Sequence, residues 1–430
     1  IIESLVKPIF SIIIPIYNSE KTILKSFGSI KKQKFFNKIE VILIDDASKD
    51  KSKKICKSIV KKNVNVKFIK NKYNLGVSKS RNKGIKLAKG DYIIFLDSDD
   101  CFMPKVLDQI YQKTKNKKYD VLYLNQNLKK DYVYKGSNLA VQNLNTLKNF
   151  TCHCWNFVIK KNFLIENKIY FENIKIFEDQ VFITDILLIR KNFYFFKKKI
   201  LVHYEYPSSL SRRTNYSSAI SCIKVMKRII LKNRSTRLGS HQTNFISKRL
   251  NFIFNILKIY FLSLRYKDVK KIILIIKYIK SLDFQFIRFK FLKQITVRNL
   301  TQKIKKDRIH LRDQIFKSLE HKRKNFKRYI FSCGVLGRSV ILISKLNKVK
   351  IHGFFDNNER MIGSNFLGYD ILSPNFLLKQ TNNQINKTIV FIVHNDNKTK
   401  KILSNQLLRY NIIKKNIIKL EFFKNLRDVR

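Results

Sequence analysis

Residues 91–100 read DYIIFLDSDD, a short apolar run that ends in three carboxylates within four positions. The run from Tyr92 to Leu96 has the length and composition of a buried strand. Carboxylates this close repel one another unless a cation lies among them, and carboxylate oxygens are ligands that Mg²⁺ and Mn²⁺ prefer. The stretch therefore predicts a strand that ends in a divalent metal site formed by Asp97 and Asp99. The alternative is an acidic turn that caps the following helix.

Other apolar runs, separated by amphipathic stretches, surround this strand. They predict strands at 10–15, 39–45, 64–69, 92–96 and 121–124. Most are continuously apolar, as in parallel sheets with both faces covered by helices. The alternation predicts an α/β fold with a mostly parallel sheet, in which ligands bind at the carboxyl ends of the strands. Ser48 and Ser78 are predicted to cap two of the helices.

Polar residues at three of these strand ends predict a crevice that suits a nucleotide-sugar donor. Tyr17 and Asn18 follow the first strand, and Asp46 follows the second. Tyr17 can stack on a base and Asp46 can accept the imide hydrogen of uracil, while Pro15 shapes the turn. Arg81 lies in the first turn of a predicted helix, where backbone amides and a guanidinium can face a phosphate.

Four segments carry a family resemblance: 11–18 (SIIIPIYN), 44–50 (IDDASKD), 74–84 (NLGVSKSRNKG) and 95–100 (FLDSDD). In order and spacing they resemble the successive signatures of the family 2 glycosyltransferases, inverting enzymes of the GT-A fold, over residues 8–215. The resemblance implies that Tyr17, Asp46 and Arg81 contact the nucleotide. It also implies that Asp97 reaches the ribose or the metal, and that Asp99 ligates Mn²⁺ or Mg²⁺, with Asp100 as the alternative ligand.

Further along, residues 178 and 179 resemble the family's acidic pair. The resemblance makes Asp179 the general base, which takes the proton of the attacking hydroxyl. Trp155 and Asn156, with Glu178, are then expected in the pocket for the sugar acceptor. Two alternatives stay open from the residues themselves: Asp179 can be a helix cap, and Trp155 can be a core residue. His203 and the segment 209–212 (SLSR) are a candidate lid over the diphosphate.

The second half of the chain predicts two more domains. Residues 221–326 have the pattern of basic amphipathic helices, read as a connector, and residues 327–430 resemble a small Rossmann-like unit, so that the first domain spans 1–220. The three glycine slots of a dinucleotide fingerprint hold Ser332, Gly334 and Gly337, so the first glycine is lost, although Asp356 stands where a ribose-binding acid would. A packing or partner-docking module is therefore expected rather than an NAD site.

Composition narrows the remaining classes. The formal charge of +59 would fit nucleic acid or an anionic membrane surface, but Lys greatly outnumbers Arg and the lysines are spread along the whole chain. Nucleic-acid binding is therefore not expected. The cluster Cys152-His153-Cys154 lacks the second ligand pair of a structural zinc site, so idle thiols are the favoured interpretation.

Location and function are also predicted. No signal peptide and no apolar run of about 18 residues is visible, which predicts a cytoplasmic protein with possible peripheral association with the inner membrane. The predicted function is transfer of a sugar from a UDP-sugar to a hydroxyl of a bacterial surface glycan, such as capsule or lipopolysaccharide, or of a lipid-linked glycan. The alternatives are a nucleotidyltransferase and a basic nucleic-acid-binding or membrane-binding protein without catalysis.

Overall fold

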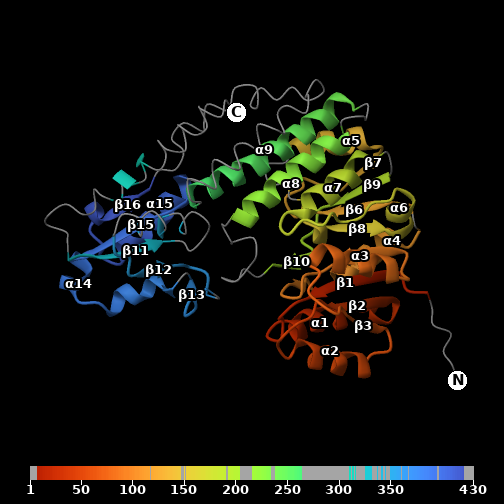
Figure 1. Ribbon diagram of the computed structural model, residues 1–430, viewed down its shortest axis with the longest axis horizontal. Helices are drawn as coiled ribbons and strands as arrows, with labels where there is room; N and C mark the ends of the chain where they lie inside the picture. The colour runs from red at the N-terminus through yellow and green to blue at the C-terminus, as the bar shows by residue number, and fades with distance from the viewer. Residues whose placement is uncertain are drawn as a thin grey trace. The chain divides into compact units, whose positions relative to one another are not determined.

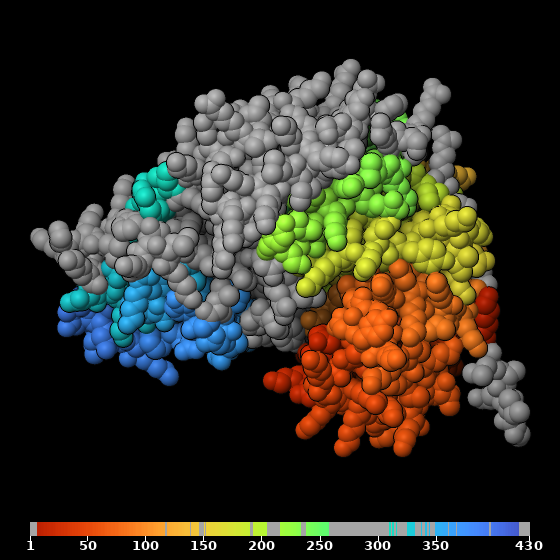
Figure 2. All heavy atoms as spheres, in the orientation of Figure 1, coloured from red at the N-terminus to blue at the C-terminus, as the bar shows by residue number. Residues whose placement is uncertain are grey.

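The structure is a computed structural model in which two compact units are distinguished (Figures 1 and 2). It describes residues 7–203 apart from 117, 147–149, 151 and 190–191, then 216–233, 238–263 and five positions between 309 and 315. It also describes 325–420 apart from 332–336, 338–339, 342–343, 345–348, 360, 367 and 395–396. The first unit comprises 1–204 and 224–252, and the second 205–223 and 253–430. The boundaries predicted at 220 and 326 stay predictions.

The first unit is built on an eight-stranded sheet in the order β3-β2-β1-β4-β8-β6-β9-β7. Strands β3, β2, β1 and β4 are mutually parallel, as predicted, and β6 is parallel to β9. The strands are β1 (Phe10–Ile16), β2 (Ile39–Asp45), β3 (Val66–Lys70), β4 (Tyr92–Phe95), β6 (Val121–Leu124), β7 (Tyr132–Lys135), β8 (Phe157–Lys160) and β9 (Asn192–Phe196). A separate antiparallel pair joins β5 (Cys101–Phe102) to β10 (Leu201–Val202).

Helices cover both faces of this sheet, which explains its continuously apolar strands. Alternate residues of β1 enter two different cores: Ile13 faces one, whereas Ile12 and Ile14 face the other. The helical segments up to residue 263 are α1 (Ile23–Lys31), η1 (Phe36–Lys38), α2 (Ser52–Lys61), α3 (Val77–Leu87), α4 (Val106–Thr114), α5 (Ser137–Thr146), η2 (Cys154–Asn156), α6 (Lys161–Glu166), α7 (Glu178–Leu188), α8 (Tyr216–Asn233) and α9 (Ser240–Ser263), of which α8 and α9 each cross the boundary between the two units. Within the described residues, no helix has both the length and the apolar character needed to cross a bilayer.

Strand β8 was not predicted, and its direction is opposite to that of its two neighbours. It pairs antiparallel with β4 and with β6, and Val158 lies opposite Ile94. Because the two strands run in opposite directions, β8 begins beside the carboxyl end of β4. The residues just before β8, including Trp155 and Asn156, therefore lie beside the carboxylates that follow β4.

The predicted helix caps at Ser48 and Ser78 were wrong. Helix α2 begins after Lys51 and helix α3 after Gly76, and neither has a side-chain cap hydrogen bond. Gly76 adopts a φ of 88°, which glycine tolerates more easily than other residues, so the chain turns into α3 there. Ser78 lies inside the helix and donates a hydrogen bond to the Ile174 carbonyl, while Ser48 Oγ accepts one from the Asn18 amide.

The second unit contains the predicted Rossmann-like sheet. Five parallel strands have the order β14-β12-β11-β15-β16, and β13 adds an antiparallel edge. They are β11 (Lys327–Phe331), β12 (Gly353–Phe355), β13 (Asn365–Phe366), β14 (Tyr369–Leu372), β15 (Thr388–Ile392) and β16 (Ile417–Lys419), with η6 (Pro374–Lys379), α14 (Asn382–Asn386), α15 (Asn397–Arg409) and η7 (Lys414–Asn416). Ser332 and Gly334 lie outside the described residues, as does most of the predicted helical connector.

Candidate active site

The end of β1 presents a partly exposed aromatic side chain. Pro15 is buried within the strand, and Tyr17, just after it, is 46% exposed. Asn18 has a positive φ of 52°, and its side-chain oxygen accepts a hydrogen bond from the Lys49 amide at 2.8 Å. The turn is thus fixed by the segment that follows β2. An accessible ring on a fixed turn can stack on a nucleobase.

Asp46, at the end of β2, is buried and holds the loop from residue 71 to residue 76. Its Oδ1 accepts hydrogen bonds from Asn71 Nδ2 and the Leu75 amide, and its Oδ2 accepts one from the Gly76 amide, all at 2.8 Å. Asn71 in turn donates to Ser80 Oγ within α3. Asp46 therefore orders the start of α3. The predicted bond from a uracil imide would have to use a lone pair that these three donors leave.

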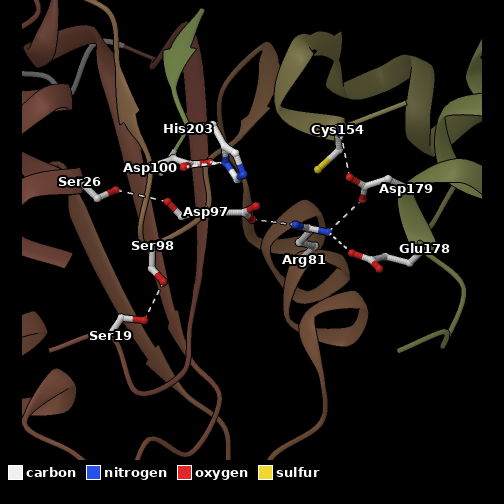
Figure 3. Close-up of polar contacts among 10 residues, drawn as sticks. All are labelled: Ser19, Ser26, Arg81, Asp97, Ser98, Asp100, Cys154, Glu178, Asp179 and His203. Carbon is white, nitrogen blue, oxygen red and sulfur yellow. Dashed lines mark hydrogen bonds and ion pairs between the residues drawn. The ribbon is translucent and has the colours of Figure 1, made fainter. Parts of the chain in front are cut away.

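The three carboxylates after β4 have different surroundings, and Figure 3 shows those of Asp97 and Asp100. Asp97 accepts a hydrogen bond from Arg81 Nη2 at 2.8 Å, and the fully buried Asp100 pairs with His203 Nδ1 at 2.9 Å. Asp99 forms no ion pair with any described residue. Burial, together with the charges of Asp97 and Asp100, raises the pKa of Asp99 to about 7. A bound cation would therefore stabilise the charged form of Asp99.

The residues present fit a divalent ion bound at few protein ligands. Among the described residues, no group of three or more His, Cys, Asp and Glu side chains is arranged to hold a metal ion. Asp99 with Asp97 supplies a hard oxygen donor set in a region of excess negative charge. A Mg²⁺ or Mn²⁺ ion with one or two carboxylate ligands completes its shell with water and substrate phosphate oxygens. The predicted ligands Asp99 and Asp97 are compatible with that kind of site.

Arg81 lies among three carboxylates (Figure 3). Its Nη1 is 2.6 Å from Glu178 Oε1 and 3.1 Å from Asp179 Oδ1, and its Nη2 is bonded to Asp97. The side chain is 4% exposed and packs over the Phe171 ring. Burial and the neighbouring Asp179 charge raise the pKa of Glu178 to about 7. The predicted contact between Arg81 and the nucleotide stays a prediction, because in this structure the guanidinium is surrounded by protein carboxylates.

Asp179 is in the first turn of α7 but does not cap it. The N-cap is Phe177, and no side chain makes a cap hydrogen bond there. Instead, Asp179 Oδ1 faces Arg81 and its Oδ2 accepts a hydrogen bond from the Cys154 amide at 3.0 Å. The cap alternative therefore does not describe Asp179. The hydrogen bonds hold the carboxylate between α3 and η2, at the edge of the sheet where the carboxylates after β4 lie.

Trp155 lies in a row of three aromatic rings. Its ring is nearly parallel to that of His153, with centroids 5.0 Å apart, and to that of His203, at 6.1 Å. His203 is also the partner of Asp100, which raises the pKa of the imidazole. Trp155 is half-buried, so it is neither a fully buried core residue nor a free surface ring. The neighbouring Asn156 is buried, and the candidate lid beyond His203 lies outside the described residues.

The thiols near Trp155 lie in the interior. Cys152 and Cys154 are both buried, and burial raises the pKa of the Cys152 thiol to about 11. A zinc ligand must be a thiolate. In the described part of the chain no third ligand accompanies these cysteines in a metal-binding arrangement.

Sequence reasoning named most residues of this site but missed the contacts that join them. Arg81 is 97 positions from Glu178 in the sequence, and His203 is 103 from Asp100. Asn71 was not singled out at all, because an isolated Asn after a strand has no distinctive pattern. Its position directly after β3, level with Asp46 after β2, was the available signal.

Comparison with known proteins supports one family. The family described as Glycosyl transferase family 2 matches residues 11–168. The glycosyltransferase GlyG of Streptococcus pneumoniae serotype 4 is 28% identical over 217 residues, which cover 44% of this chain and 71% of that protein. The minor teichoic acid biosynthesis protein GgaA of Bacillus subtilis is 33% identical over 213 residues, which cover 44% of this chain and 47% of that protein.

A solved structure has the same fold. The crystal structure of residues 1–349 of S. aureus TarS in complex with UDP aligns with a TM-score of 0.52 at 20% identity, covering 70% of this chain and 89% of that one. At this identity the likeness concerns the fold. It agrees with the α/β sheet described above.

Proposed function

Through residues 11–168 the chain belongs to the family 2 glycosyltransferases, and on that premise we propose that it transfers a sugar, with inversion, from a UDP-sugar to a hydroxyl of a surface glycan or lipid-linked glycan. One observation carries the proposal. The carboxylate expected on the donor side, Asp97, and the expected base, Asp179, are hydrogen-bonded to the same guanidinium, that of Arg81. An inverting transfer needs donor anchor and base close together on one face of the sheet.

The reaction follows from these positions. The hydroxyl oxygen of the sugar acceptor attacks the anomeric carbon of the donor while its proton passes to the Asp179 carboxylate. The bond between the anomeric carbon and the phosphate oxygen breaks, and the nucleoside diphosphate leaves with the electron pair. Tyr17 stacks on the nucleobase of the donor, and Asp46 orders the neighbouring loop from residue 71 to residue 76.

A divalent cation is part of the proposal. Asp99, with Asp97, would hold Mn²⁺ or Mg²⁺, whose charge stabilises the departing diphosphate. The support is the arrangement of the carboxylates after β4: Asp99 has no ion-pair partner among the described residues, whereas Asp97 and Asp100 each have one. The chemistry of the donor set thus favours a cation at Asp99.

The acceptor is proposed as a bacterial surface polymer or its lipid-linked precursor. Support comes from the relatives: GgaA is named for minor teichoic acid biosynthesis, and another relative is named poly(ribitol-phosphate) beta-glucosyltransferase. Trp155, half-buried beside the base, offers an aromatic face on which a sugar ring can pack. Peripheral association with the membrane follows if the acceptor is lipid-linked, and stays a prediction.

A binding and turnover experiment tests the proposal. Thermal unfolding of the full chain is measured with a panel of nucleotide sugars, each with and without Mn²⁺, followed by transfer assays with the sugars that bind. We expect the unfolding temperature to rise with a UDP-sugar and Mn²⁺ together, by more than with either alone. No shift with any nucleotide sugar would contradict the donor assignment, and release of pyrophosphate instead of UDP would favour a nucleotidyltransferase.

A further inference from the structure

We propose that Arg81 is a positioning residue: it holds Asp179 as the general base and ties it to the donor side through Asp97, rather than contacting the donor phosphates itself. The inference rests on the proposed glycosyl transfer, since it assigns the base its support. It departs from the role that the sequence resemblance implies for this arginine.

The geometry shows how the base is held. Asp179 has one oxygen 3.1 Å from Arg81 Nη1 and the other 3.0 Å from the Cys154 amide. A carboxylate fixed at both oxygens keeps a single orientation. The Cys154 amide belongs to η2, which also carries Trp155, so the base is aligned with the predicted pocket for the sugar acceptor. Arg81 is the other half of this support.

The same guanidinium reaches the donor side. Nη2 donates to Asp97 at 2.8 Å, and Nη1 also donates to Glu178 at 2.6 Å. Three carboxylates around one buried cation leave an excess of negative charge, which is tolerable only because the guanidinium lies between them. Displacing Arg81 would therefore move residues on both sides of the reaction.

Direct contact with a phosphate is poorly compatible with this arrangement. The Arg81 side chain is 4% exposed, Nη1 donates to both Glu178 and Asp179, and one N–H of Nη2 donates to Asp97, while Nε is buried and has no hydrogen-bond partner among the described residues. Without displacing a carboxylate, a diphosphate could approach the guanidinium only at the second N–H of Nη2 or at the buried Nε, and it would add further negative charge to a cluster that already holds three carboxylates. Arg81 thus acts on the donor through Asp97.

The helix that carries Arg81 is itself fixed from the nucleotide side. The Gly76 amide, at the start of α3, donates to Asp46 Oδ2, and Ser80, next to Arg81, accepts a hydrogen bond from Asn71. Asn71 also donates to Asp46. A continuous set of hydrogen bonds therefore runs from the end of β2 through α3 to the base on α7.

The first test separates chemistry from nucleotide binding. Arg81→Lys keeps a charge but cannot reach several carboxylates in a planar fork. We expect kcat to fall about 100-fold, the usual cost of misplacing a catalytic group by about 1 Å, while the Kd of UDP in the presence of Mn²⁺ changes less than threefold. Arg228→Lys is the matched control, because Arg228 forms a more exposed pair with Glu172 in the same unit, and it should leave both values unchanged. The proposal would be overturned if Arg81→Lys raised the Kd of UDP at least tenfold while uridine binding and kcat were retained.

The second test does not depend on activity. Arg81→Met leaves the buried carboxylates without their cation and should lower the unfolding temperature by about 10 °C. Glu178→Gln should lower the unfolding temperature of the wild type, where it removes an ion pair, and raise that of Arg81→Met, where it removes an uncompensated charge. Equal effects of Glu178→Gln in the wild type and in Arg81→Met would contradict the proposal that Arg81 holds the three carboxylates together. If the wild type binds no UDP, the proposed donor fails, while this cycle still decides whether Arg81 holds the cluster.

Discussion

The two units use a similar plan, a parallel sheet with helices, but differ in the polar contacts made just beyond the ends of their strands. In the first unit, the carboxylates after β4 meet Arg81, His203 and, through Arg81, the acidic pair of α7. In the second unit, Asp356 follows β12, and its Oδ1 accepts a hydrogen bond from the Asn358 backbone amide, while the side-chain amides of Asn357 and Gln406 pair with each other. The polar groups at this second strand end contact the local loop and a nearby helix.

The contrast shows that the sheet supplies a place for chemistry but not the chemistry itself. Both units bring loop residues to the carboxyl ends of parallel strands. In the first, segments far apart in the sequence converge there with opposite charges, and the arrangement supports a reaction. Matched substitutions in the two units can test this difference.

The largest effect is expected from removing the charge of Asp99, one of the three carboxylates after β4. Asp99→Asn should lower kcat by about 1000-fold or more, because the diphosphate loses its cation. The fold should not be destabilised, since Asn relieves repulsion from Asp97 and Asp100. The matched change Asp356→Asn should leave kcat within about twofold. Steady-state transfer assays on the two variants decide the comparison, and equal losses would break it.

Removing divalent cations should have an effect nearly as large. After treatment with EDTA we expect transfer to stop and to return with Mn²⁺ or Mg²⁺. An independent readout is the unfolding temperature with UDP: added Mn²⁺ should raise it in the wild type and in Asp356→Asn, but not in Asp99→Asn. Full transfer in EDTA would exclude the proposed role of the cation.

A moderate effect on stability is expected at Gly90, where backbone atoms of the first sheet approach closely. A Cβ at Gly90 would lie 2.6 Å from the Ser11 amide nitrogen and 2.7 Å from the Phe10 carbonyl carbon, both backbone atoms. Gly90→Ala should therefore cost about 2–3 kcal/mol of unfolding free energy. Gly353→Ala in the second sheet, 3.1 Å from the Asp370 carbonyl oxygen, should cost less than about 1 kcal/mol.

Urea unfolding of the full chain can measure the two glycine variants. Fluorescence of Trp155, the single tryptophan, reports on the first unit, and circular dichroism reports on both. A larger loss for Gly353→Ala than for Gly90→Ala would reverse the expected order of packing.

The smallest effect is expected at the sugar acceptor. Trp155→Ala should raise the KM for the acceptor about tenfold, as expected for loss of one aromatic face worth about 1.4 kcal/mol, with a smaller change in kcat. Tyr410→Ala in the second unit, whose hydroxyl bonds to Asn375, should leave this KM unchanged. An unchanged KM in Trp155→Ala would return Trp155 to a packing role.

The sequence predicted the parallel half of the first sheet well, because its strands are continuous apolar runs bounded by polar residues. Strands β2 and β6 were predicted with their observed bounds. Strand β8 was missed because a run of only four residues is recognised as a strand once its pairing with β4 and β6 is known, and the sequence does not show that pairing. Strands β14 and β16 in the second unit are similarly short and were missed for the same reason.

The site showed the same division. Residue types and their positions after strands predicted the crevice, and the family resemblance supplied the roles. The environment of Arg81 could not be read, since its three partners come from two distant segments. Ser78 was mistaken for a cap because its sequence context is right for one, whereas the positive φ of Gly76 moves the helix start.

The direction of β8 has a consequence for how this enzyme can change. The chain enters β8 at the edge of the sheet where the carboxylates after β4 lie and leaves it at the opposite edge, so residues 152–156 precede the strand and lie outside its pairing with β4 and β6. Side-chain exchanges at Trp155 would alter the surface offered to the acceptor without shifting the pairing of β4 with β1 or the Cys154 backbone amide that holds Asp179. Acceptor preference and donor chemistry can therefore diverge separately within one fold.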